Sequence, residues 1–310
     1  MPIELTQINS SQFQALSRAT TVFFFAVGPL EDHGPHLPLG LDLQEARFLG
    51  WKAAQELEKQ MPGWSGVIMP EAALGIEANT SQIVITVRAH VLRDWLVDSC
   101  RCLIRCGFFH FVCFTGHLGP RQLTAIEEAG KIIGRAQWWN PRSAPFFVPK
   151  KIRPTLLSAQ SGSISWKEVL TSPFWPDPKE HGGERDTSVA LAISEGLVSP
   201  IFQDLPRVNR LSSRWIRNFS RRMGRLSGYW GDPSVAHPKQ GEIEMAQSVE
   251  VLFPKFKVVW EGHRPQSLFR SWYSILPPNQ SFFKAWLLFA LILLFLAGWS
   301  FLSALTYHLD

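Results

Sequence analysis

A short segment near the N-terminus carries side chains that could bind a metal ion or move protons. Its sequence is VGPLEDHGPHLPLGLDLQEA, and it holds carboxylates at Glu31 and Asp42 and imidazoles at His33 and His36. Charged side chains are seldom buried unless they are paired or bound to a metal. The segment follows the apolar run TVFFFAVG, and its glycines and prolines favour a fixed loop. We therefore expect a buried strand that delivers metal ligands to a site.

Two later segments, TGHLGP and EHGGERDTS, have a similar composition and also place a histidine beside a glycine. Ligands of open α/β sheets bind at loops beyond the carboxyl ends of the strands, so loops that follow different strands can converge. An oxygen-rich ligand set with some nitrogen suits a pair of divalent ions such as Zn²⁺ or Mn²⁺ better than a closed structural zinc site. The expected set is Glu31, His33, Asp42, His117 and Glu184.

Alternating strands and helices must position these loops. Strands are predicted from TVFFFAVG, GVIMP, SQIVITVRAH and FFHFVCFTG. Helices are predicted from LQEARFLGWKAAQELEKQ, LRDWLVDSCRCLIRCG, LTAIEEAGKIIGRA and DTSVALAISEGL. This alternation predicts an α/β fold with a mostly parallel sheet and helices on both of its faces. The pattern weakens over about 138–180, which we expect to be an irregular insertion that covers the site.

Composition and charge narrow the range of functions. The chain of 310 residues is long enough for one large α/β domain or two smaller ones. The net charge of +5 is mild and comes mostly from one arginine-rich stretch, so nucleic acid is not an expected partner. That stretch, 207–225, is either a cationic face for anionic lipid or a solvated or intersubunit surface. The four cysteines fit no common zinc spacing and no disulfide framework.

The C-terminal run AWLLFALILLFLAGWSFLSALTY contains no charged side chain and is long enough to cross roughly 30 Å of hydrocarbon. Trp286 and Tyr307 near its ends suit the membrane interface, and a buried core helix is the alternative interpretation. Basic residues precede this run, so we expect a single-pass membrane protein whose catalytic domain faces the cytoplasm. The expected organisation is a catalytic domain over 1–264, a linker over 265–284 and a transmembrane anchor over 285–307.

The three segments resemble the signature motifs of the creatininase family. Members of this family are metal-dependent amidohydrolases with a three-layer α/β/α fold. The first motif, roughly Glu-x-His-Gly-x-His-Leu-Pro followed by Asp, is matched from Glu31 to Asp42. Gly116-His117 resembles the second motif, and the segment from His181 to Ser188 resembles the third. A later segment, GYWGDPSVAHPKQGE, resembles the family's Gly-Asp-Pro segment. The resemblance runs from about residue 3 to 255 and leaves out the tail.

The resemblance implies a role for each matched ligand. Asp42 would bridge two metal ions, Glu31 and His117 would complete the site of one ion, and His33 would serve the other. The implied cofactor is two divalent ions per chain, Zn²⁺ or Mn²⁺, with Fe²⁺ as a further option. The family pattern also suggests a homo-oligomer.

The last ligand differs among family members. Some use a carboxylate two positions after the Gly-His histidine, where this chain has Gly119. Others use the fourth position of the third motif, and that pattern implies Glu184 here. His181 would then be the catalytic proton shuttle to the leaving nitrogen. Leu118 and Pro120 depart from the residues usual beside the second motif, and we expect them to reshape the substrate contacts.

The implied activity is hydrolysis of a cyclic or linear amide C–N bond in a small molecule, through a metal-bound hydroxide. Two alternatives stay open. The departures at Leu118 and Pro120 motivate the first alternative, a catalytically idle scaffold or binding protein at the membrane. The second alternative is a deformylase-like or peptidase-like relative that acts on a different amide.

Overall fold

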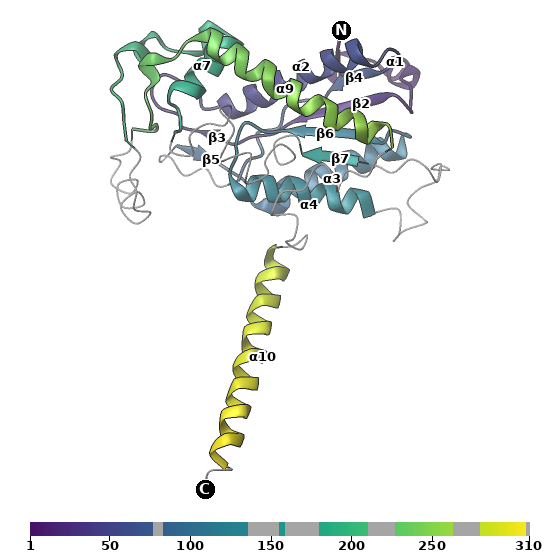
Figure 1. Cartoon of the computed structure of the whole chain (residues 1–310). Coiled ribbons are helices and arrows are strands. Elements are labelled where there is room, and N and C mark those ends of the chain that lie inside the picture. The colour runs from purple at the N-terminus through teal and green to yellow at the C-terminus, as the bar shows by residue number, and fades with distance from the viewer. Residues whose placement is uncertain (77–82, 136–154, 159–179, 210–226, 263–279, 308–310) are drawn as a thin grey trace.

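A parallel sheet lies at the centre of the molecule in the computed structural model (Figure 1). The structure describes residues 1–76, 83–135, 155–158, 180–209, 227–262 and 280–307. In this part of the chain the sheet has the order β1-β4-β2-β6-β7, and every pairing in it is parallel. Its strands are β1 (Ile3–Glu4), β2 (Thr21–Ala26), β4 (Ser65–Ile68), β6 (His110–Phe114) and β7 (Thr155–Ser158).

Strand β2 occupies the middle of the sheet because it is apolar on both faces. Successive side chains of a strand point to opposite faces. Accordingly Val22 and Phe24 belong to one core cluster, and Phe23 and Phe25 belong to the other. Burial of each of these phenylalanines contributes about 1.5–3 kcal/mol. A strand that is buried on both faces reads as a continuous apolar run, which is the pattern of TVFFFA.

Helices cover both faces of the sheet (Figure 1). One face is covered by α2 (Leu41–Gln60), α7 (Glu184–Ile193) and α9 (Pro238–Trp260). The other face is covered by α3 (Ala89–Arg105) and α4 (Pro120–Arg135). The predicted three-layer α/β/α arrangement with a mostly parallel sheet is therefore confirmed. The shorter elements are α1 (Ser10–Ala15) and the 3₁₀ turns Leu5–Gln7, Glu195–Leu197, Pro200–Asp204 and Pro233–Val235.

Two loops leave the carboxyl ends of β2 and β6 and meet at the first turn of α2. The first passes through β3 (Leu30–Glu31), which pairs antiparallel with β5 (Val84–Ile85). The second contains Gly116, whose N–H donates to the carbonyl oxygen of Asp42 at 3.1 Å. A Cβ atom at position 116 would lie 2.6 Å from that oxygen. Only glycine permits this approach, which brings the second loop against the helix that carries Asp42.

The predicted elements do not include β7 or α9. Strand β7 falls inside the stretch of about 138–180 that was expected to be irregular, and the rest of that stretch lies outside the described residues. Helix α9 continues through Pro254, a residue that normally ends or kinks a helix. Apolar side chains on both sides of this proline, among them Leu252, Phe253 and Phe256, are buried in the core against α2. Tertiary packing therefore outweighs the local signal.

The C-terminal helix α10 (Gln280–Tyr307) does not support the predicted membrane anchor. Over 287–300 the large apolar side chains of this helix are exposed. Within the described residues, no helix combines the length and apolarity that crossing a bilayer requires. This finding contradicts the predicted transmembrane segment over 285–307, and with it the single-pass membrane localisation and the lipid partner. Most of the predicted linker, 265–284, lies outside the residues that the structure describes.

His110 at the start of β6 makes folding sensitive to acid. Its side chain is 7% exposed, and its ring lies 5.4 Å from that of Trp64. Burial lowers the pKa of His110 from 6.5 to about 4. The unfolded chain therefore binds more protons than the folded chain between these two pH values. The contribution of His110 to stability is complete above pH 6.5 and falls as the pH drops through this window.

Replacing His110 with glutamine should reduce this acid sensitivity. Between pH 7 and pH 5 the free energy of unfolding should fall less in His110→Gln than in the wild type. The difference between the two losses should be on the order of 2 kcal/mol. Urea unfolding followed by circular dichroism at both pH values measures the difference. Equal losses in the two proteins would show that His110 does not titrate in this window.

Candidate metal centre

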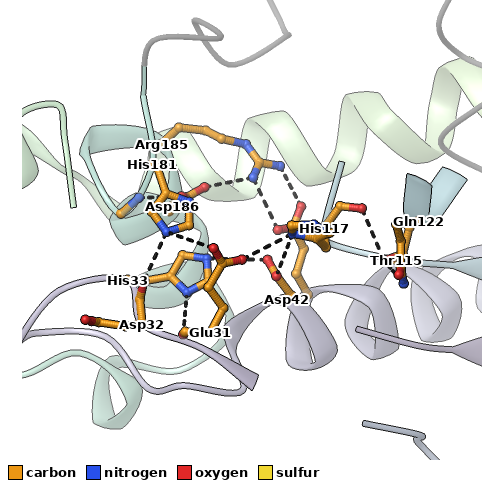
Figure 2. A network of polar contacts seen from close by, with 12 residues as sticks. Glu31, Asp32, His33, Asp42, Thr115, His117, Gln122, His181, Arg185 and Asp186 are labelled. Carbon is orange, nitrogen blue, oxygen red and sulfur yellow. Dashed lines mark hydrogen bonds and ion pairs between the residues drawn. The ribbon is translucent and has the colours of Figure 1, made fainter. Parts of the chain in front are cut away.

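Five of the six predicted site residues lie together at the carboxyl ends of β2 and β6 (Figure 2). The first loop and the first turn of α2 supply three of them, the β6–α4 loop supplies one, and the residues just before α7 supply one. The five are Glu31, His33, Asp42, His117 and His181. Long-range folding therefore assembles a set of carboxylates and imidazoles from three distant segments.

The carboxylate of Asp42 lies between two histidines. Its Oδ1 atom is 3.5 Å from His33 Nε2, and its Oδ2 atom is 3.5 Å from His117 Nδ1. The side chain is buried, and Oδ2 makes no hydrogen bond with any described residue. A buried carboxylate oxygen is normally hydrogen-bonded or bound to a cation. Each oxygen of this carboxylate thus faces a different imidazole.

Glu31 makes a similar link to the same nitrogen of His117. Its Oε2 atom lies 3.2 Å from His117 Nδ1, and its Oε1 atom lies 3.9 Å from His181 Nε2. Two groups of side chains have ligand atoms within 4.8 Å of one another and could each hold a metal ion. These groups, found among the described residues, are Glu31–Asp42–His117 and Glu31–His33–His181.

Backbone carbonyls select the tautomers of two histidines. His33 Nδ1 lies 2.9 Å from the carbonyl oxygen of Glu31, which can only accept a hydrogen bond. In the neutral ring, Nδ1 therefore carries the hydrogen and Nε2 presents its lone pair toward Asp42, which is the form that a metal ligand needs. His181 Nε2 lies 3.0 Å from the carbonyl oxygen of Asp32 and so donates its own hydrogen. In the neutral ring, Nδ1 of His181 therefore carries no hydrogen.

Burial and the two carboxylates set the protonation of these histidines. Burial opposes the charged form of His33, but Asp42 outweighs it and raises the pKa of His33 to about 10. Burial is likewise outweighed at His117, where Asp42 and Glu31 raise the pKa to about 10. For His181, burial and the nearby His33 lower the pKa, so its imidazole is neutral at neutral pH. Cations at the two carboxylates would replace the protons of His33 and His117.

These observations fit a divalent-metal site. The donor set combines carboxylate oxygens with imidazole nitrogens, which is the chemistry that Zn²⁺ and Mn²⁺ share. A buried oxygen of Asp42 lacks a hydrogen bond within the described part of the chain, and Nε2 of His33 faces the same carboxylate. The prediction of a divalent-metal cofactor is therefore confirmed in that the chain contains side-chain groups able to hold such ions.

The structure does not bring the sixth predicted residue, Glu184, to the other five. Glu184 is the first residue of α7, its side chain is exposed, and it belongs to neither metal-binding group. The alternative ligand position, Gly119, has no room for a side chain. A Cβ atom there would lie 2.4 Å from Nε2 of His117. The second and third motifs thus contribute His117 and His181 to the cluster, without a carboxylate from either of these two positions.

An ionic cluster beside the site is not among the predicted residues. Arg185 donates to both carboxylate oxygens of Glu45, at 2.5 and 3.2 Å, and to Glu244 Oε1 at 2.5 Å. It also donates to Oδ1 of Asp186 at 3.0 Å, while Oδ2 of Asp186 accepts from the Gly182 N–H at 2.7 Å (Figure 2). Burial raises the pKa of Glu45 to about 7, even though Arg185 opposes that rise. The cluster joins α2, α7 and α9 behind the loop of His181.

One sequence signal could have indicated this cluster. Glu45 follows Asp42 by three residues on α2, so the two carboxylates lie on the same face of that helix.

Gln122 and Thr115 were also not predicted as site residues. Gln122 Nε2 donates to Thr115 Oγ1 at 3.3 Å, and Thr115 Oγ1 donates to the carbonyl oxygen of His117 at 3.4 Å (Figure 2). Nothing in a local pattern marks such contacts.

His36, whose role the sequence leaves open, is not part of either metal-binding group. Its Nε2 atom lies 2.9 Å from Oγ1 of Thr187 in α7. Burial lowers the pKa of His36 to about 4, so the ring is neutral at physiological pH. The arginine-rich stretch over 207–225 was expected to be either a cationic face for lipid or a solvated or intersubunit surface, and from residue 210 onward it lies outside the described residues.

Comparisons with solved structures agree with this fold. A putative creatinine amidohydrolase from Bacteroides fragilis is 19% identical and has a TM-score of 0.60, and the match covers 84% of this chain and 97% of that one. A structure titled "Creatininase Mn" is 18% identical, with a TM-score of 0.59 and coverage of 84% and 99%. A variant creatininase of "Zn-Zn type" is 17% identical, with a TM-score of 0.59 and the same coverage. At these identities the likeness shows the fold.

Sequence comparison with family models gives the more specific result. A search of curated proteins found no match. The model of the creatininase family, creatinine amidohydrolase, matches residues 6–254, which is most of the chain. The matched range contains all five clustered side chains and both carbonyls that fix the histidine tautomers. The chain therefore belongs to the creatininase family.

Proposed function

We propose that this protein is a metal-dependent amide hydrolase acting on the C–N bond of a small cyclic or linear amide. The observation that carries the proposal is the buried carboxylate of Asp42, whose two oxygens face His33 and His117. Family membership supports the reaction class, and the two candidate metal-binding groups support the need for divalent ions.

The proposed ligands divide into two sets that share Asp42. Glu31 and His117 would hold one ion with Asp42, which is the first of the two groups described above. His33 would hold the other ion through its contact with Asp42, whereas the second group joins His33 to Glu31 and His181. Two of the similar creatininase structures are named as manganese and zinc forms, and the same ions are proposed here. When bound, such ions polarise a carbonyl group and lower the pKa of water. Glu184 is left out of the proposed set because its side chain is exposed.

His181 is proposed to move the proton. Its ring is neutral at neutral pH, and its Nε2–H is held by the carbonyl oxygen of Asp32. The ring stacks on His33, with centroids 4.2 Å apart, and lies 4.9 Å from the ring of Trp230. These contacts fix the plane of the imidazole. The imidazole, whose Nε2 lies 3.9 Å from Oε1 of Glu31, is proposed to accept a proton and pass it to the leaving nitrogen, as histidine does in general acid–base catalysis.

The remaining predictions about partners stand as proposals. The substrate is proposed to be a small amide, and the chain is proposed to form a homo-oligomer, as the family resemblance suggests. A deformylase-like or peptidase-like activity would use the same metal ligands and proton shuttle. A panel of creatinine, formamides and short peptide amides, tested with protein loaded with Mn²⁺ or Zn²⁺, separates these substrates. Stoichiometric metal without turnover on any of them would favour an idle binding protein.

Replacing Asp42 with asparagine should remove the metal. The amide keeps the shape of the side chain but cannot bridge two cations with negative oxygens, so affinity for Mn²⁺ should fall by more than about 100-fold. Elemental analysis after dialysis measures the retained ions, with about two expected per chain for the wild type. Glu184→Gln is the matched control and should keep both ions. Loss of an ion from this control would restore Glu184 as a ligand.

Replacing His181 with glutamine should separate catalysis from metal binding. If His181 is the proton shuttle, kcat on the best amide of the panel should fall by about 10²–10⁴-fold. The bound metal should remain, because the proposed ligands are untouched. Elemental analysis and kinetics on the same sample make the comparison. Loss of one ion from His181→Gln would instead assign His181 to the group that it forms with Glu31 and His33.

A further inference from the structure

A buried hydrogen bond joins the first motif to the third. His36 Nε2 and Thr187 Oγ1 lie 2.9 Å apart, although the two residues are separated by 151 positions. Their side chains are 1% and 0% exposed. A hydrogen bond sheltered from water is costly to leave unmade, because either partner would then be buried unsatisfied. This pair therefore resists separation of the first loop from α7.

The segments around this hydrogen bond are packed backbone against backbone. Gly182 has a φ of +61°, and a Cβ atom there would lie 2.3 Å from the carbonyl oxygen of His33 and 2.9 Å from Cβ of Tyr229. The Tyr229 ring meets the His36 ring edge-on at 5.7 Å. A change in the distance between His36 and Thr187 would therefore be transmitted to the contact between Gly182 and His33.

Both ends of the hydrogen bond belong to segments that carry site residues. His36 lies on the loop of His33, and Thr187 lies in α7 directly after the loop of His181. The rings of His33 and His181 stack at an interplanar angle of 25° with centroids 4.2 Å apart. The stack therefore depends on how the same two segments are placed relative to each other.

We propose that His36 and Thr187 are positioning residues, and that their hydrogen bond sets the placement of His33 and His181 and thereby the affinity of the metal centre. This inference rests on the proposed function, because it takes His33 as a metal ligand. Neither residue is proposed to touch a metal ion or the substrate. Groups that orient metal ligands from outside the ligand set typically change metal affinity by about 10–100-fold when they are removed.

Substitutions at Thr187 test the role of its hydroxyl group. Thr187→Val removes the hydroxyl and keeps the shape of the side chain, while Thr187→Ser keeps the hydroxyl. Val189→Ala is a stability control, because Val189 is fully buried in the same helix but lies in the apolar core. Titration of the full chain with Co²⁺ gives the affinity, and the visible absorption of the bound ion reports its coordination geometry.

The expected result is that Thr187→Val binds Co²⁺ about 10-fold more weakly than the wild type, with a changed visible spectrum. Thr187→Ser and Val189→Ala should match the wild type in both readouts, although Val189→Ala should unfold at a lower temperature. Wild-type affinity and spectrum in Thr187→Val would overturn the inference, as would an equal loss of affinity in Val189→Ala.

Failure of the proposed function has a different signature. If the wild type itself binds no Co²⁺, the metal centre is wrong and the inference falls with it. If circular dichroism shows that Thr187→Val is unfolded, Thr187→Ala takes its place, with the same expected loss and the same overturning result.

Discussion

Two buried carboxylates held close together are the constraint on which the rest of the structure depends. Glu31 and Asp42 both lie beside His117, almost out of contact with water, and each charge opposes ionisation of the other. Burying an unpaired charge costs several kcal/mol, so this pair needs positive charge nearby. The imidazoles supply it as protons, and divalent ions would supply it more strongly. The fold therefore concentrates the negative charge of two carboxylates at this site, and protonated imidazoles or bound divalent ions balance that charge.

Packing between the layers of the fold holds the segments that carry these carboxylates in place. Strand β2 packs against both helical layers, which gives the first loop a rigid starting point. Asp42 lies in the first turn of α2, where the helix dipole favours a negative side chain. Gly116 brings the loop after β6 into contact with the same turn. On the other side, Arg185 ties α2 to α7 and α9 through carboxylates of all three helices, and so fixes the approach of the His181 loop.

Sequence reasoning found the site where the signal was local. Strand β2 and the loop from Glu31 to Asp42 could be predicted because an apolar run and a motif mark them. Glu184 illustrates the limit. Residues two apart on a helix point roughly 200° apart, so a motif cannot tell which carboxylate of α7 faces inward. Position 184 is exposed, while Asp186 holds the Gly182 N–H. Helix α9 was missed because contacts with α2 outweigh its proline, and no local pattern records such contacts.

Anomalous diffraction from crystals of the full chain loaded with Mn²⁺ tests the central claim most directly. The account predicts two anomalous peaks, one beside each carboxylate oxygen of Asp42, with His33 at one peak and His117 at the other. Peaks that leave the Asp42 carboxylate without a contact, or a single peak held by His33 and His181 alone, would contradict it.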